Sequence, residues 1–366
     1  MNNNRFPIYI QYSQLLIGIL ALGFILYIGR GILFPLVFAL ILSILVNPIM
    51  VRFEKNHLGR IVAISIIVFT SFLIVCGVLY FIVSQLANLS DALPQLESKF
   101  HQLSEQVIQW ISENFHITSK RINIWITKLK AEGMGGGTLF IGQTISSITG
   151  ILVFIFLVPV YMFLFLYYKP LLLEFVARLF PTDQHATVAE VLLESKKLIQ
   201  NYLLGLAIEA LIMMVLNSTA LLIIGIEYAI LIGIIGALLN VIPYIGGVTS
   251  LVIALVLTLV TKDTESAIWV FIAYSVIQFI DNNFIVPKIV ASQVRVNALI
   301  SIIVVFIGGA LWGLPGMFLS LPVTAILKVI FDRIESLKPW GFLVGDTLPS
   351  IYGTIFKIRR RKSSQS

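Results

Sequence analysis

A cluster of polar side chains lies near the end of the otherwise apolar segment 266–287. Its members are Gln278, Asp281, Asn282 and Asn283. Residues three and four apart are neighbours on a helix, so Gln278, Asp281 and Asn282 are expected to share one face. A carboxylate flanked by amides can bind a cation, a proton or a polar substrate. The structural alternative is that the cluster caps a helix end at the membrane interface before Pro287.

Two further polar residues lie in apolar surroundings. Glu209 follows Tyr202 and Gly205, and it either faces a cavity or lies at the cytoplasmic boundary of its segment. Asn240 comes before Pro243, and a proline break frees backbone carbonyls that can coordinate an ion or a substrate. A charged residue at the centre of a membrane-spanning helix costs roughly 2.5–3.5 kcal/mol, so each such group requires a partner or a cavity.

Two long uncharged runs contain helix-breaking residues. The run 228–261 contains Asn240, Pro243, Gly246 and Gly247, and the run 296–327 contains Gly308, Gly309, Gly313, Pro315, Gly316 and Pro322. The second run as one straight helix would be about 48 Å long, against a hydrocarbon core of roughly 30 Å. Each run must therefore bend, break or fold back. Broken apolar runs indicate a binding site in a secondary transporter, whereas glycine alone also serves close helix packing.

Motifs of enzymes are missing from the sequence. The four histidines (His57, His101, His116 and His185) lie outside the apolar segments, and none belongs to a zinc-protease motif. No glycine-rich nucleotide loop and no hydrolase nucleophile elbow occurs. We therefore expect no catalytic residue, no metal and no cofactor. The net charge of +7 reflects membrane orientation more often than a nucleic-acid partner in such a chain.

The composition assigns these residues to helices that cross a membrane. Of the 366 residues 58% are hydrophobic and only 12% are charged, too few charges to cover a soluble protein of this size. The sequence predicts an all-α polytopic membrane protein of about eight spans (eight to ten, depending on how the broken runs fold). The first five spans are expected at 12–29, 31–51, 61–83, 148–168 and 203–224.

Four regions follow from this pattern. They are N-terminal membrane helices (1–84), an amphipathic helical region with a glycine-rich joint (85–147), a transport domain with an interfacial helix over 171–200 (148–338) and a basic tail (339–366). The second region carries a heptad seam, formed by Leu86, Leu89, Leu93, Leu96, Phe100, Leu103, Val107 and Trp110. It predicts contact between subunits of a homo-oligomer or, alternatively, packing within one subunit or on the lipid surface. Pro94 argues against one unbroken coiled coil.

Basic residues in the short loops predict the orientation. Lys and Arg residues occur after spans two and four, after the segment 266–287 and in the tail. If the number of spans is even, all of these residues lie on one side of the membrane. Both termini are therefore expected in the cytoplasm, with 85–147 outside. The only cysteine, Cys76, lies within an apolar segment and excludes an intramolecular disulfide.

Three motifs resemble those of a known family. The run from Leu239 to Gly247, which includes Tyr244, resembles the Asn-x-Ile-Pro-Tyr-x-Gly signature of the autoinducer-2 exporter family of bacterial membrane proteins. The stretch 278–287 is similar to the second motif of that family, and 308–316 followed by Leu321 and Pro322 is similar to its closing segment. The likeness covers nearly the whole chain.

This resemblance implies an oligomeric, all-helical transporter in the bacterial inner membrane. Some members export a small quorum-sensing signal, and others are sodium or lithium/proton antiporters. Glu209 departs from the family, because many members have no carboxylate there. The expected function is export of a small polar molecule by alternating access around the three motifs. The alternatives are a monovalent cation/proton antiporter that uses Asp281, and a non-transporting membrane scaffold.

Overall fold

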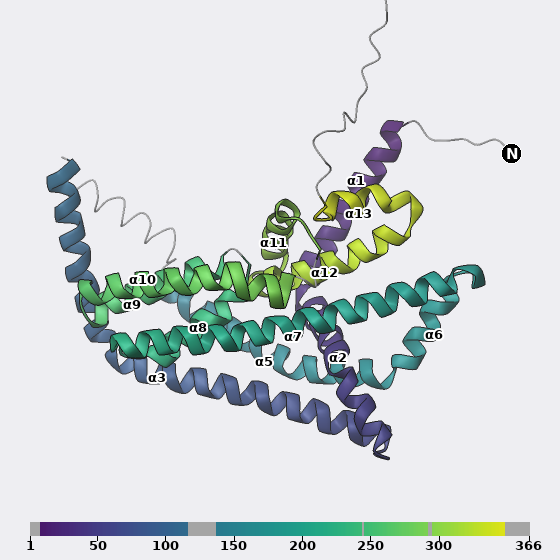
Figure 1. Cartoon of the computed structure of the whole chain (residues 1–366), viewed down its shortest axis with the longest axis horizontal. Helices are drawn as coiled ribbons and strands as arrows, with labels where there is room; N and C mark the ends of the chain where they lie inside the picture. Colours follow the sequence, from purple (N-terminus) through teal and green to yellow (C-terminus); the bar gives the residue numbers. More distant parts are fainter. Residues whose placement is uncertain (1–7, 116–136, 244, 292–294, 348–366) are drawn as a thin grey trace, which may run out of the picture.

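The computed structural model describes residues 8–115, 137–243, 245–291 and 295–347, and all regular elements in these ranges are helical (Figure 1). The elements are α1 (Ile8–Ile28), α2 (Arg30–Lys55), α3 (Arg60–Phe115), α5 (Gly137–Tyr167), α6 (Lys169–Leu179), η1 (Thr182–Gln184), α7 (His185–Ile224), α8 (Ala229–Asn240), α9 (Gly246–Thr261), α10 (Thr264–Ile280), η2 (Asp281–Ile285), η3 (Pro287–Ala291), α11 (Ala298–Trp312), α12 (Leu314–Arg333), η4 (Glu335–Leu337) and α13 (Lys338–Val344).

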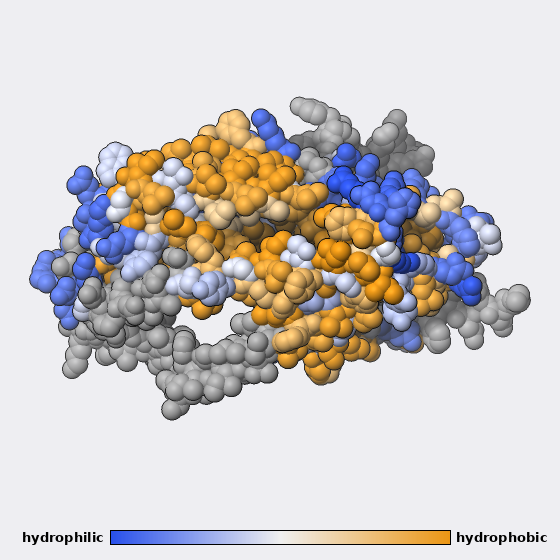
Figure 2. Space-filling model, turned by 90° about the horizontal axis from the view of Figure 1, so that it is seen from below, coloured by the Kyte–Doolittle hydropathy of each residue, from blue (hydrophilic) through white to orange (hydrophobic). Residues whose placement is uncertain are grey.

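Several of these helices are long and apolar enough to cross a membrane. Among the described residues there are five, and the bent pair α5–α6 makes a sixth. Helices α8, α9 and α11 are apolar but shorter. Figure 2 shows a broad hydrophobic surface with hydrophilic residues gathered mostly toward the two ends. The predicted all-helical, multispanning membrane protein is confirmed.

The N-terminal helices α2, α3 and α5 pack around a common core. Its buried members are Ala39, Met50, Ile64, Ile67, Val158, Met162 and Leu166. The Arg60 guanidinium donates hydrogen bonds to the last carbonyls of α5, at 2.9 Å from Leu166 O and 3.0 Å from Tyr167 O. Beyond this point the chain bends by 66° into α6. Arg60 therefore supplies donors for carbonyls that the bend leaves without helical partners.

Helix α3 differs from the expectation at position 94. Its backbone is helical over all 56 residues, because a proline inside a helix removes one hydrogen bond and bends the helix more readily than it ends it. Figure 1 shows α3 bent rather than interrupted. The structure does not describe the side chains of the heptad seam, the glycines 133–136 or the basic residues 357–362.

The segment 171–200 is not the single interfacial helix that was expected. It consists of α6 and the first turns of α7, separated by a short irregular stretch with a 3₁₀ turn. Phe180 adopts an extended conformation because it precedes Pro181, which disfavours helical backbone at the residue before it. Helix α7 then runs for 40 residues to Ile224. Glu209 therefore lies well inside a long helix and not near the end of a span.

The run 228–261 folds back as a hairpin of α8 and α9. At about 1.5 Å per residue, α8 is about 18 Å long and α9 about 24 Å long, and the two helices pack against each other. Lys262 at the end of α9 donates a hydrogen bond to the carbonyl of Ile224 at the end of α7. Both ends of the hairpin therefore lie at one end of the bundle, and its tip reaches the interior.

The run 296–327 also folds back, as α11 and α12. Gly313, with φ of 67°, makes the turn between them. The backbones of Gly308 and Gly316 come so close that a Cβ on Gly308 would lie 2.4 Å from the Gly316 carbonyl oxygen. These glycines allow two helices to pack tightly, as the packing alternative for Gly308 and Gly309 predicted.

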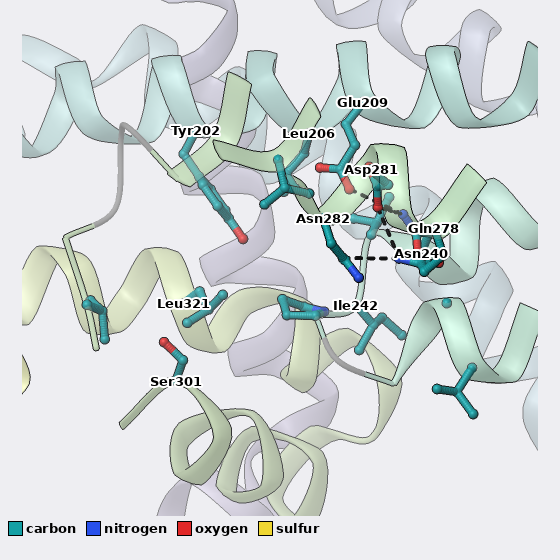
Figure 3. Close-up of a pocket in the computed structure, with 16 residues that line it drawn as sticks. Tyr202, Leu206, Glu209, Asn240, Ile242, Gln278, Asp281, Asn282, Ser301 and Leu321 are labelled. Carbon is teal, nitrogen blue, oxygen red and sulfur yellow. Dashed lines mark hydrogen bonds between the residues drawn. The ribbon is translucent and has the colours of Figure 1, made fainter. Parts of the chain in front are cut away.

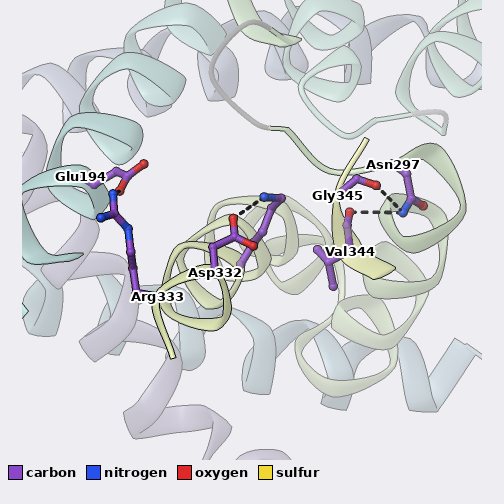
Figure 4. Close-up of polar contacts among 7 residues, drawn as sticks. Glu194, Asn297, Asp332, Arg333, Val344 and Gly345 are labelled. Carbon is purple, nitrogen blue, oxygen red and sulfur yellow. Dashed lines mark hydrogen bonds and ion pairs between the residues drawn. The ribbon is translucent and has the colours of Figure 1, made fainter. Parts of the chain in front are cut away.

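Polar contacts join the ends of the C-terminal helices (Figure 4). Arg333, the last residue of α12, pairs with Glu190 at 2.6 Å and Glu194 at 2.9 Å on α7. The Asn297 amide donates to backbone carbonyls at the end of α13, including Leu343 O at 2.7 Å, and its Oδ1 accepts from the Ile300 amide at 2.9 Å. The N-terminal part of α7 and the C-terminal end of α12 therefore lie at the same end of the bundle, which we call the inner end.

The opposite end, where Lys262 meets Ile224, is the outer end. Helix α10 begins there with a side-chain cap, because Asp263 accepts a hydrogen bond from the Ser266 amide at 2.7 Å. This bond lowers the pKa of the exposed Asp263 carboxyl. Helix α10 then runs back into the bundle and continues at Asp281 as a π-helical turn. The tip of the α8–α9 hairpin and the end of α10 thus meet beside α7.

Candidate functional site

A pocket of about 410 Å³ lies where these elements meet (Figure 3). It is bounded by α7, the tip of the α8–α9 hairpin, the end of α10 with its π-helical turn, and the α11–α12 pair. The lining residues are Tyr202, Leu206, Glu209, Asn240, Val241, Ile242, Pro243, Gly247, Val248, Gln278, Asp281, Asn282, Val286, Val296, Ser301 and Leu321. The lining is mostly apolar with a few converging polar groups, which is typical of small-molecule sites.

Two buried carboxylates face this pocket and share one amide. Glu209 is 4% exposed and Asp281 is 1% exposed. The Asn240 amide nitrogen donates to Asp281 Oδ2 at 2.9 Å and to Glu209 Oε1 at 3.3 Å. Figure 3 shows the three side chains pointing toward one another from three different elements. Asn240 therefore bridges an acid pair whose members repel each other when both are ionised.

Gln278 completes the polar side of the pocket. Its amide nitrogen donates to Asp281 Oδ2 at 3.3 Å and to Asn282 Oδ1 at 3.2 Å. The shared face predicted for Gln278, Asp281 and Asn282 is thereby confirmed. Gly247 makes this arrangement possible, because a Cβ at position 247 would lie 2.2 Å from Gln278 Oε1.

One carboxylate oxygen of the acid pair has no hydrogen-bond partner in the part of the chain that the structure describes. Asp281 Oδ1 is fully buried and makes no hydrogen bond to any residue that the structure describes. A buried anionic oxygen without a donor is expensive, and native proteins retain such groups where a ligand or a proton completes them. Asp281 Oδ1 is therefore the atom of the acid pair that still lacks a donor, and it is buried rather than open to the pocket.

Local sequence explains why these groups point inward. Pro243 cannot continue the hydrogen bonding of α8, so the chain turns after Asn240 and re-enters a helix at Gly246. Gly246 packs on the backbone of α8, where a Cβ would lie 1.9 Å from the Leu239 carbonyl oxygen. The π-helical turn at Asp281 changes the direction in which successive side chains project, and such turns are frequent at functional sites.

The structure brings together only some of the residues singled out in the sequence. Those on the pocket lining are Glu209, Asn240, Pro243, Gly247, Gln278, Asp281 and Asn282. Asn283 is exposed and donates to the Phe279 carbonyl at 2.8 Å, so its side chain is used outside the pocket. Gly308, Gly309 and Gly313 are not on the lining and serve the α11–α12 contact and its turn. Tyr244 lies outside the described residues.

Several lining residues were not anticipated. Tyr202 and Leu206 precede Glu209 by seven and three residues, so helical periodicity places them on its face of α7, and this spacing was available in the sequence. Ser301 and Leu321 lie on the side of the pocket away from the acid pair in Figure 3. No sequence pattern links Ser301 and Leu321 to the acid pair, because the packing of α11 and α12 places them on the pocket lining.

The donor atoms limit what the pocket can hold. They are carboxylate, amide and hydroxyl groups, which suit hard cations, protons and polar solutes. Within the residues that the structure describes, no group of three or more His, Cys, Asp and Glu side chains is placed to hold a metal ion. The acid pair can accept a proton or a monovalent cation, and its repulsion falls when it does so.

The chain resembles known proteins along most of its length. Residues 16–336 match the model of a family described as AI-2E family transporter. Among relatives, "Putative permease PerM" of Escherichia coli (strain K12) is 27% identical over 336 residues, covering 86% of this chain and 91% of that protein. "Putative transport protein YrrI" of Bacillus subtilis (strain 168) is 26% identical over 312 residues, covering 82% of this chain and 86% of that protein. The chain therefore belongs to the AI-2E family of transporters.

Proposed function

We propose that this membrane transporter exports a small polar molecule through the pocket and that the acid pair couples the export to a proton. The observation that carries the proposal is that Asp281, a residue of the pocket lining, has a buried Oδ1 without a hydrogen-bond partner among the described residues. A carboxylate that alternately holds and releases a proton requires an atom that is free of protein donors in one of its states. Buried ionisable residues at membrane depth are the usual components of proton relays in transporters.

The size and lining of the pocket support a small polar solute. A volume of about 410 Å³ falls in the range of small-molecule sites and exceeds what one ion needs. The amides of Gln278 and Asn282 and the hydroxyls of Tyr202 and Ser301 offer donors and acceptors on opposite sides. Export is the direction that the family resemblance indicates.

A second candidate is exchange of a monovalent cation for a proton. The closeness of Glu209 and Asp281, which both accept from the Asn240 amide nitrogen, favours it, because two neighbouring carboxylates supply the hard oxygen ligands that a monovalent cation prefers. In this mechanism the cation and the proton compete for the acid pair. A scaffold without transport would have no use for a buried acid pair, so that alternative is not favoured. An enzymatic role is not favoured either.

We further propose that the chain lies in the bacterial inner membrane with both termini in the cytoplasm. The inner end of the bundle then faces the cytoplasm, and the α8–α9 hairpin enters from outside. A cysteine at Ser98 on a Cys76→Ser background tests this orientation. It should react with an impermeant thiol reagent on intact cells, and reaction only after permeabilisation would reverse the assignment.

Transport by the purified protein in proteoliposomes with an entrapped pH dye tests the function. Autoinducer-2 is the signal for which the family is named. A gradient of autoinducer-2 across the vesicle membrane should drive proton movement, and an imposed pH gradient should drive transport of autoinducer-2. A dye response to sodium or lithium alone would replace the first candidate by the second. No response to either solute class, from protein that remains folded in the vesicles, would overturn both.

A further inference from the structure

A second group of buried polar atoms lies beside the pocket. It consists of Asn217 and Ser218 on α7, Ser250 on α9 and Tyr274 on α10, and we call it the outer seam. Asn217, Ser250 and Tyr274 are 2%, 4% and 5% exposed. The Asn217 Oδ1, both serine Oγ atoms and the Tyr274 Oη have no hydrogen-bond partner of standard geometry among the described residues, although the Tyr274 hydroxyl lies close to that of Ser250.

Other hydroxyls in the same helices do not share this property. Thr249, Thr258, Thr261 and Ser275 each donate to the carbonyl four residues earlier, at 2.7–2.8 Å. This bond is the usual way in which a helical hydroxyl avoids a penalty in an apolar environment. Ser218 and Ser250 forgo it although their helices offer the same carbonyls. Their hydroxyls are therefore available for something other than their own helix.

The outer seam continues from the pocket toward the outer end. Asn217 lies eight residues beyond Glu209 on α7, Tyr274 lies four residues before Gln278 on α10, and Ser250 lies three residues after Gly247 on α9. In each case the seam residue lies closer than the pocket residue to the outer end of the bundle, where α7 ends and α10 begins. The seam thus starts about one helical turn from the polar side of the pocket.

Glycines of α8 close the seam in this structure. A Cβ on Gly236 would lie 2.3 Å from Ser250 Oγ and 3.5 Å from the Asn217 amide nitrogen. A Cβ on Gly233 would lie 2.2 Å from Ser218 Oγ. Beyond the seam an apolar cluster that includes Leu221, Ala254 and Val270 packs the outer end. The polar atoms of the outer seam are therefore enclosed between the pocket and this apolar cluster.

We propose that the outer seam is the outer half of the proton path and takes water when the α8–α9 hairpin separates from α7 and α10. The proposal rests on the proposed proton-coupled function. The seam has hydroxyls that both donate and accept and an amide oxygen that accepts, a mixture that suits water better than a cation. Its polar atoms then have partners in the open state and lack them in the closed one.

Protons pass along this path without net chemical change in the seam. In export a water molecule of the seam gives a proton to a carboxyl of the acid pair, and each water or hydroxyl binds one proton on an oxygen lone pair as it gives up another. Ser250 and Tyr274 take part in this exchange, whereas Asn217 Oδ1 only accepts and holds a water in place. The first proton of this series comes from bulk water at the outer end, the side from which protons enter when a pH gradient drives export.

Cysteine labelling measures the hydration of the seam directly. Ser250→Cys on a Cys76→Ser background should react from the outer side with a small, water-soluble, impermeant thiol reagent while a pH gradient and autoinducer-2 drive turnover. The control is Ala39→Cys, a fully buried alanine in the core of α2, α3 and α5, which should stay unlabelled. A Ser250→Cys variant that stays unlabelled under turnover would overturn the proposal.

Flux measurements then test the proton path. Tyr274→Phe and Ser250→Ala should slow gradient-driven transport about tenfold, while exchange of autoinducer-2 across vesicles without a pH gradient stays near normal. Thr258→Val, which removes a hydroxyl that is already bonded to the Ala254 carbonyl, should change neither. Normal proton flux in both seam variants would refute the path. A wild-type protein that moves neither solute nor protons would instead refute the proposed function, and labelling at position 250 would still report on the seam.

Discussion

Replacing Asp281 by asparagine separates a coupling role from a structural one. The substitution keeps the size of the side chain and one acceptor oxygen but removes the charge and the capacity to exchange a proton. In the structure Asp281 Oδ2 accepts hydrogen bonds from Asn240 at 2.9 Å and from Gln278 at 3.3 Å. The asparagine oxygen can take this place, and its amide group can occupy the position of the unpartnered Oδ1.

The effect on stability should be small. A hydrogen bond to a charged acceptor contributes about 1.5–3 kcal/mol and a neutral one about 0.5–1.5 kcal/mol, so two weakened bonds lose about 2–3 kcal/mol together. Removing the buried charge also removes its desolvation penalty, which is on the order of several kcal/mol. The two effects largely cancel, and we expect Asp281→Asn to insert, fold and assemble like the wild type.

The effect on transport should be large. Without a group that binds and releases a proton, the pH gradient cannot drive the solute, so gradient-driven transport in proteoliposomes should fall by at least about a hundredfold. Asn283→Ala is the matched control, because Asn283 lies in the same π-helical turn but uses its side chain outside the pocket. Wild-type transport by Asp281→Asn across a range of pH would refute the coupling role.

Four further changes test the pocket, the contact at the inner end and the contact between subunits. Glu209→Gln should reduce gradient-driven flux about as strongly as Asp281→Asn, because Glu209 is buried within the acid pair. Gly247→Ala should raise the KM for autoinducer-2, because a Cβ there meets a pocket amide at 2.2 Å and such overpacking costs about 1–3 kcal/mol. Arg333→Ala should widen the α7–α12 distance measured by spin-label spectroscopy, because it removes both ion pairs that join the two helices at the inner end. Leu89→Asp with Leu96→Asp should shift the oligomer to smaller species in light scattering.

The last three of these tests have a control or an opposing outcome. Gly18→Ala adds the same methyl group where no atom lies within 4 Å, so it should leave KM unchanged. A normal KM in Gly247→Ala would mean that the amide of Gln278 is not held as described. An unchanged distance in Arg333→Ala would assign the inner-end contact to apolar packing alone. A monomeric wild-type protein would remove the subunit contact.

Hydropathy along the chain was sufficient to predict the membrane-spanning character and the helices. An apolar run must form its backbone hydrogen bonds internally wherever it lies in the bundle, so the composition of 31–51 or 61–83 alone predicts a helix. The Gly/Pro breaks were equally local, since Pro243 and Gly313 act on their own backbone. The boundaries of α6 and α7 were less predictable, because α7 gains its length by packing against α8 and α12.

The candidate site could be predicted only one segment at a time. The face shared by Gln278, Asp281 and Asn282 follows from helical spacing. The sequence left open whether Glu209 faces a cavity or the cytoplasmic boundary, and whether Gly308 serves a site or a packing contact. Both questions depend on neighbours that are distant in the chain.

Only the tertiary structure decided that Glu209, Asn240 and Asp281 meet. Asn240 is separated by 31 residues from Glu209 and by 41 from Asp281, and the hydrogen bonds between them exist because the α8–α9 hairpin turns its tip inward. The same folding back encloses the hydroxyls of Ser250 and Tyr274, which the sequence shows only as scattered polar residues. Burial in lipid is a property of each segment and can be predicted from its composition, whereas the pairing of buried polar groups is a property of how the segments pack.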